Sequence, residues 1–64
     1  MDFHLYYDGS SILLLTPVTE AAINWSDSHL PDDAPMLGNA VAVELRYIGD
    51  IIDGIRGDGL SVAA

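Results

Sequence analysis

The residues best suited to chemistry in this sequence are carboxylates and histidines, because the chain has no cysteine. Asp33, Gly38 and Glu44 occupy the first, sixth and twelfth positions of a calcium-binding loop. Pro35 and Leu37, however, stand at the third and fifth positions, where such a loop supplies oxygen ligands. We therefore do not expect calcium binding.

The other titratable residues offer little for catalysis or for a transition metal. His4 and His29 are far apart and lack the spacing of a metal site. Asp50 and Asp53 could form a carboxylate pair for acid–base chemistry, but a solvated helix face explains their spacing more simply. No serine has the sequence context of an activated nucleophile. The sequence predicts a protein that is not an enzyme and has no cofactor or metal site.

Charge is the most unusual property of the chain. Ten acidic residues against two arginines, with no lysine, give a net charge of −8. Disordered acidic tails lack aromatic and branched residues, whereas half of this chain is hydrophobic. We expect a folded domain that repels nucleic acid and is attracted to basic protein surfaces. The alternative is that the acidity only maintains solubility or reflects a salt-rich host.

The length predicts a single domain, residues 1–64, near the lower limit for folding without disulfides or metals. The apolar run from Ile12 to Leu15 is far too short to span a membrane, and no secretory signal is apparent. We therefore expect no membrane association and a cytoplasmic location.

The first two strands are expected to form a hairpin over residues 3–15. Asp8 and Gly9 predict a type I′ turn, which would pair Tyr7 with Ser10. Partners across the strands share a face. That register directs five residues at the core: Phe3, Leu5, Tyr7, Ile12 and Leu14.

The opposite face of this hairpin is then not fully polar. It would carry Leu13 and Leu15, near His4 and Tyr6. Such an apolar face would be covered either by another segment of the chain or by a second copy in a homodimer, and the sequence does not choose between these two alternatives.

The first helix is expected over residues 17–29, with Thr16 as its cap and Pro17 at its first position. Leu30 and Pro31 end it. Its apolar stripe predicts burial of Trp25 and contains Val18, Ala21, Ala22 and Trp25.

A third strand at residues 40–45 leads into a second helix at residues 47–56, and residues 32–39 form a loop between the first helix and this strand. Gly57 is expected to be the left-handed cap of the second helix, and residues 60–62 could add an edge strand. The buried stripe of the second helix consists of Ile48, Ile51, Ile52 and Ile55.

The element order β-β-α-β-α, with a possible last β, predicts an α+β fold with a small antiparallel or mixed sheet. Right-handed crossovers would place both helices on one face of the sheet, with their polar sides turned to water. We expect the partner-binding surface to consist of Glu20, Asp27, Asp50 and Asp53, with Asp32 and Asp33 from the loop. Asp2 and Asp8 lie beyond this acidic surface and should matter less for partner binding.

Four segments carry a resemblance to known proteins: LTPVT at 15–19, HLPDDA at 29–34, VELRYI at 43–48 and GIRGDGL at 54–60. Through them the chain resembles short acidic proteins of phages and their proteobacterial hosts. In size and charge it is similar to anti-CRISPR proteins that act on type I-C systems. The resemblance implies an inhibitor in the host bacterial cytoplasm whose acidic face mimics DNA.

The partner implied by this resemblance is a basic nucleic-acid-binding protein, such as a subunit of a CRISPR surveillance complex. The alternative is a small structural or oligomeric domain that makes apolar contacts through Leu13, Leu15 and Tyr6. Clustered carboxylates would favour the inhibitor, and scattered ones the structural domain.

Overall fold

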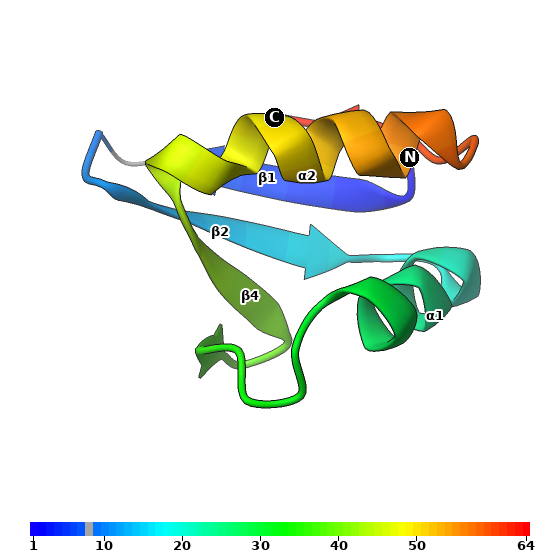
Figure 1. Cartoon of the computed structure of the whole chain (residues 1–64), viewed down its shortest axis with the longest axis horizontal. Coiled ribbons are helices and arrows are strands. Elements are labelled where there is room, and N and C mark those ends of the chain that lie inside the picture. Colours follow the sequence, from blue (N-terminus) through cyan, green and yellow to red (C-terminus); the bar gives the residue numbers. More distant parts are fainter. Residues whose placement is uncertain (8) are drawn as a thin grey trace.

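The computed structural model describes residues 1–7 and 9–64. Within them the chain forms a mixed five-stranded sheet and two helices, which confirms the predicted α+β fold (Figure 1). The elements are β1 (Phe3–Tyr7), β2 (Ile12–Pro17), α1 (Glu20–His29), β3 (Met36–Leu37), β4 (Ala40–Glu44), α2 (Leu45–Gly57) and β5 (Val62–Ala63).

The sheet has the strand order β3-β4-β2-β1-β5, so β2 lies in its centre. β2 pairs antiparallel with β1 and β4, β3 pairs antiparallel with β4, and β5 joins β1 in parallel. The crossovers through α1 and α2 start from antiparallel strands and run toward opposite edges of the sheet. One handedness therefore puts both helices on the same face, as expected.

The predicted register of the first hairpin is wrong. β1 pairs with β2 so that Tyr7 faces Leu13 and Leu5 faces Leu15, three residues beyond the expected partners. A slip by an odd number of residues exchanges the two faces of a strand. Because β2 is apolar at four consecutive positions, its own pattern does not determine which face is buried. The predicted turn at residues 8 and 9 lies partly outside the described residues.

The consequence is an exchange of core residues in β2. Leu13 and Leu15 are buried, whereas Ile12 is exposed and Leu14 is half-buried. Tyr7, also expected in the core, is exposed. The hydrophobic core joins one face of the sheet to both helices and contains Phe3, Leu13, Leu15, Ala22, Trp25, Val41, Val43, Ile48 and Ile55.

Helix α1 begins three residues later than predicted. Pro17 still belongs to β2, and the cap is Thr19, whose Oγ1 accepts a hydrogen bond from the Ala22 amide at 3.1 Å. The stripe shifts accordingly, so Ala22 and Trp25 are buried while Val18 is exposed. The predicted burial of Trp25 is confirmed.

Helix α2 confirms the isoleucine stripe, with Ile48 and Ile55 buried and Ile51 and Ile52 partly buried against the core. Gly57 is its last residue and not the left-handed cap. That conformation belongs to Gly59, with φ of 83°, two residues later. The edge strand near the C-terminus is present as β5.

The segment predicted to be a loop contains strand β3. A two-residue turn at Gly38 and Asn39 joins β3 to β4. Gly38 has φ of 63°, while Asn39 is not in the positive-φ region, which is the φ pattern of a type II′ turn. This hairpin extends the sheet toward α1 and forms one wall of the groove described below.

Candidate acidic interface

The six carboxylates proposed for partner binding are all exposed. Glu20 and Asp27 lie on α1, Asp50 and Asp53 on α2, and residues 32–33 in the segment between α1 and β3. Both helices bury their apolar stripes against the same sheet face. Their carboxylates therefore lie on the helical side of the molecule.

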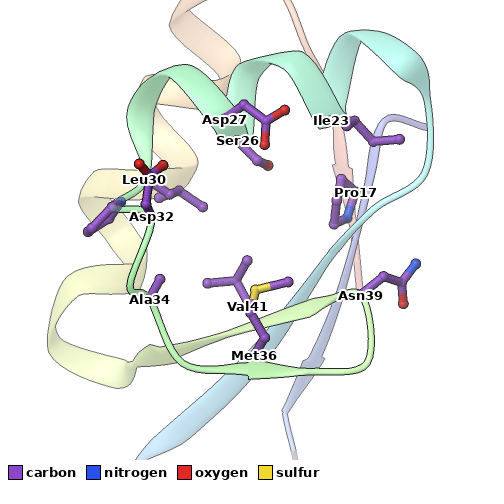
Figure 2. Close-up of a pocket in the computed structure, with 11 residues that line it drawn as sticks. Pro17, Ile23, Ser26, Asp27, Leu30, Asp32, Ala34, Met36, Asn39 and Val41 are labelled. Carbon is purple, nitrogen blue, oxygen red and sulfur yellow. The ribbon is translucent and has the colours of Figure 1, made fainter.

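The structure brings two of these carboxylates to one groove. Asp27 and Asp32 line a cavity of about 410 Å³ between α1 and the β3–β4 hairpin. Figure 2 shows Asp27 and Ser26 on the α1 side of this groove, with Met36 and Val41 opposite. The groove is lined by Pro17, Ile23, Ser26, Asp27, Leu30, Pro31, Asp32, Ala34, Met36, Asn39 and Val41.

The other four carboxylates do not line this groove. Asp33 lines a second, mainly apolar depression between residues 30–35 and the Tyr47–Ile51 side of α2. Glu20, Asp50 and Asp53 line neither depression and extend from the helices into water.

The two arginines neutralise little of this acidity. Arg46 Nε donates a hydrogen bond to Glu44 at 2.7 Å, and its guanidinium lies 4.8 Å from the centre of the Tyr47 ring. Arg56 lies in the last turn of α2, where the helix dipole favours a cation. The contacts of Arg46 therefore do not involve any of the six proposed carboxylates.

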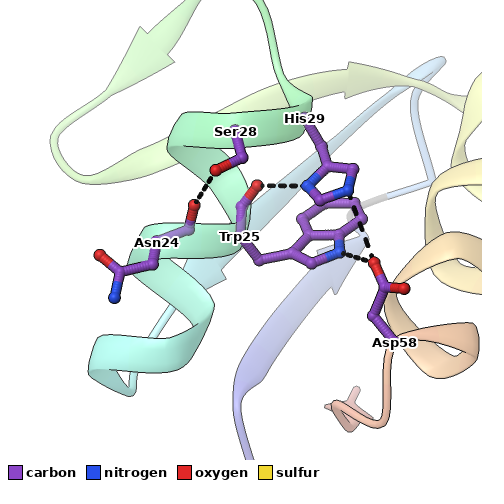
Figure 3. Close-up of polar contacts among 5 residues, drawn as sticks. All are labelled: Asn24, Trp25, Ser28, His29 and Asp58. Atoms are coloured by element: carbon purple, nitrogen blue, oxygen red, sulfur yellow. Dashed lines mark hydrogen bonds and ion pairs between the residues drawn. The ribbon is translucent and has the colours of Figure 1, made fainter.

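A polar cluster that the sequence did not predict joins the ends of the two helices (Figure 3). The Trp25 indole donates a hydrogen bond to Asp58 Oδ2 at 2.7 Å, and His29 Nε2 lies 3.5 Å from the same oxygen. His29 Nδ1 lies 2.9 Å from the Trp25 carbonyl, which can only accept, so Nδ1 carries a hydrogen. The two rings are stacked with centroids 4.2 Å apart.

Asp2 has a structural role, because its carboxylate accepts hydrogen bonds from two distant parts of the chain. Its Oδ1 accepts a hydrogen bond from the Thr19 hydroxyl at 2.8 Å, and its Oδ2 accepts one from the Ser61 amide at 3.0 Å. These bonds, with the Thr19 bond as the largest cause, hold the pKa of Asp2 below its ordinary value. Since Ser61 lies 59 residues away, no local signal could have revealed this role.

The structure groups no three potential metal ligands among residues 1–7 and 9–64. His4 lies on β1 and His29 on α1. The calcium-like positions are distributed over a hairpin, with Gly38 in its turn and Glu44 at the N-cap of α2. In the part of the chain that is described, neither helix has the length and apolarity required to cross a membrane.

Comparison with known proteins finds no family model, curated protein or solved structure that matches this chain.

Proposed function

We propose that the chain is a phage-type inhibitor that binds a basic, DNA-binding surface of a host defence complex. Its helical face would take the place of DNA on that surface. The observation that supports this proposal best is the distribution of charge between the two sides of the molecule. All six proposed carboxylates are exposed, and the four on helices extend from the layer that covers the sheet.

The opposite side of the sheet has a different composition. The strand register turns Tyr6, Ile12, Leu14 and Ala42 to this side, and Glu44 is its one carboxylate among the described strand residues. Acidity that served only solubility would not need this separation. A one-sided negative field speeds the encounter with a basic groove and excludes DNA from it.

The dimensions agree with a short DNA segment. The molecule measures 28 × 21 × 17 Å. Duplex DNA of that length carries roughly 16 phosphates at about one per 1.7 Å. One side of a duplex presents about half of these phosphates, so the six carboxylates of the helical side approach that number, and the net charge of the whole chain is −8.

A gel-shift experiment with a purified type I-C surveillance complex and its target DNA tests this proposal. We expect the chain to block DNA binding at low salt. Asp50→Asn combined with Asp53→Asn should weaken the block by up to about thirtyfold, since each of the two exposed ion pairs contributes up to about 1 kcal/mol. DNA binding that persists in stoichiometric excess of the chain would overturn the proposal for this complex.

The matched control adds two positive charges at residues outside the helices and outside the six proposed carboxylates. Ser11→Lys with Leu37→Lys changes the net charge as much as the Asp50 and Asp53 pair, and both residues are exposed. Equal weakening by the two double variants would mean that only total charge matters. The helical face would then have no specific role.

The second candidate is an oligomeric domain, and the uncovered sheet face favours it. No described helix or strand packs over this face, where Tyr6 is 56% and Ile12 40% exposed. Ile12 and Leu14 thus replace the predicted pair Leu13 and Leu15, which are buried in the core.

Sedimentation at two salt concentrations tests this candidate. A homodimer through the sheet face should dissociate in Leu14→Asp, because the substitution places a charge in the middle of the apolar row. A native chain that is monomeric at both concentrations would exclude it.

A further inference from the structure

The groove between α1 and the β3–β4 hairpin combines an apolar interior with acidic side chains. Seven of its lining residues are apolar: Pro17, Ile23, Leu30, Pro31, Ala34, Met36 and Val41. Its volume of about 410 Å³ lies within the range of about 300–1,000 Å³ typical of ligand sites. An apolar groove of this kind favours an occupant that has aliphatic length.

The polar groups of the groove restrict the charge of that occupant. Asp27 and Asp32 contribute carboxylates, and Figure 2 shows Asp27 on α1 and Asp32 on the segment that follows this helix. The groove contains no lysine or arginine, so an anion would meet only repulsion. The carboxylates therefore favour a cation.

A third group in the groove lacks a hydrogen bond. The Ser26 hydroxyl oxygen is buried and has no partner among the described residues. Buried polar atoms are normally paired, and one that faces a groove is available to a bound group. Because Oγ is buried, Ser26 would turn its hydroxyl toward the groove to accept a hydrogen bond from a cationic donor that enters beside Asp27.

We propose that this groove binds one long cationic side chain, a lysine or arginine, of a basic protein partner. The aliphatic stem lies against Ile23, Leu30 and Val41, and the charged head reaches Asp27 and Asp32 at the rim. Lysine and arginine side chains commonly bury their stems on apolar surface in this way and keep their heads near water. The existence of the basic partner rests on the proposed function, whereas the chemistry of the groove does not.

The groove would give the acidic face an anchor that a diffuse field lacks. Exposed charge pairs contribute little individually and weaken with salt. A side chain held in an apolar groove adds burial, which salt does not screen. The partner would then be chosen by the position of one basic side chain and not by its total charge alone.

Nuclear magnetic resonance titration of the intact chain tests this site with three probes. The first is a blocked Gly-Lys-Gly peptide, the second is the same peptide with norleucine, which has the stem without the charge, and the third is ammonium ion. We expect the lysine peptide to shift the amide signals of Ser26, Asp27 and Val41 with saturation. The other two probes should bind more weakly.

Variants of the chain distinguish binding in the groove from attraction to the overall negative charge of the protein. Asp27→Asn and Asp32→Asn should each weaken the lysine peptide roughly two- to fivefold, the effect of one exposed ion pair. Ser26→Ala should weaken it without loss of fold, because its hydroxyl has no described partner. The control, Glu44→Gln, removes one charge at an exposed residue outside both the groove and the six proposed carboxylates, and it should leave the affinity within twofold.

Two results would overturn the inference. Norleucine and lysine peptides of equal affinity would make the groove a neutral apolar site. Shifts that do not saturate, or that map to α2, would mean that lysine meets only the diffuse field. If lysine binds the groove but the surveillance complex is not inhibited, the proposed function falls and the site stands.

Discussion

Asp2 connects three parts of the chain that are distant in sequence. Its carboxylate receives the hydroxyl of Thr19, the cap of α1, and both the amide and the hydroxyl of Ser61, which precedes β5. Its own amide and carbonyl bond to Ser61 and Val18. One residue thus links the start of β1 to the start of α1 and to the residue that precedes β5.

The variant Asp2→Ala should lower the urea midpoint of unfolding at neutral pH, because it removes the acceptor of these bonds. The native pKa of Asp2 is depressed below 3.8. Its stabilisation is therefore complete above that pH and is lost as the pH falls through the native pKa. The difference between native and variant midpoints should shrink below about pH 4.

The control is Asp50→Ala, whose carboxylate faces water on α2. It should change the midpoint little, and its effect should not follow the same pH profile. Equal midpoints for Asp2→Ala and the native chain at pH 7 would mean that these hydrogen bonds contribute nothing net.

Helix α2 is the element best specified by the sequence, yet it contains two interior glycines, Gly49 and Gly54. A Cβ on Gly54 would lie 3.5 Å from Trp25 Cζ2, an ordinary contact. Gly54→Ala should therefore stabilise the fold by roughly 0.5–1 kcal/mol, chiefly through the entropy of the unfolded chain. Urea unfolding measures the change.

Gly59 gives the opposite expectation after the end of the same helix. Its φ of 83° lies in the left-handed region, so Gly59→Ala should cost roughly 1–2 kcal/mol although nothing lies near its Cβ. If Gly54→Ala also destabilised the fold, Trp25 would lie closer to Gly54 than the 3.5 Å distance indicates.

The elements that could be predicted are those whose own hydrophobic pattern determines which face is buried. The isoleucines of α2 repeat with the helical period, and this helix was predicted within two residues at its start. Strand β2 has no alternation over residues 12–15, so its register depends on β1, β4 and the helices together. β3 has two residues, too few for any period.

The candidate site divides in the same way. Exposure of the helical carboxylates follows from amphipathic pattern alone, and all of them are exposed. The groove at Asp27 and Asp32 could not be predicted, because it requires the path of residues 30–36 and the β3–β4 hairpin. Ser26 carried no sequence signal, since an unpaired hydroxyl is recognised only once its neighbours are placed.

At the scale of the whole molecule, self-repulsion should oppose folding. The Debye length is about 30 Å at 0.01 M salt and about 10 Å at 0.1 M. The molecule is 28 Å long, so at the lower concentration every carboxylate interacts across it. We expect the free energy of unfolding to rise as sodium chloride increases over this range.

The double variant Asp50→Asn with Asp53→Asn provides the comparison, since fewer like charges should give a smaller salt dependence. A free energy of unfolding that falls with salt would show that ion pairs such as Arg46–Glu44 outweigh the repulsion.

The two sides of the molecule should respond to salt in opposite directions. Binding of a basic partner to the helical face is an attraction between opposite charges and should weaken as salt rises. Association of two copies through the sheet face joins chains of net charge −8 and should strengthen as that repulsion is screened. Both responses can be measured on one preparation at about 0.05 M and about 0.3 M salt. A binding assay measures the affinity for the partner, and sedimentation measures the dimer.

The two variants should change partner binding and dimerisation differently. Asp50→Asn with Asp53→Asn weakens partner binding and favours any dimer, because it removes repulsion on the helical side. Leu14→Asp disrupts the dimer and leaves partner binding unchanged, since Leu14 pairs with Tyr6 and Ala42 on the far side of the sheet. Loss of partner binding in Leu14→Asp, with its fold intact, would show that the sheet face and not the acidic face makes the contact.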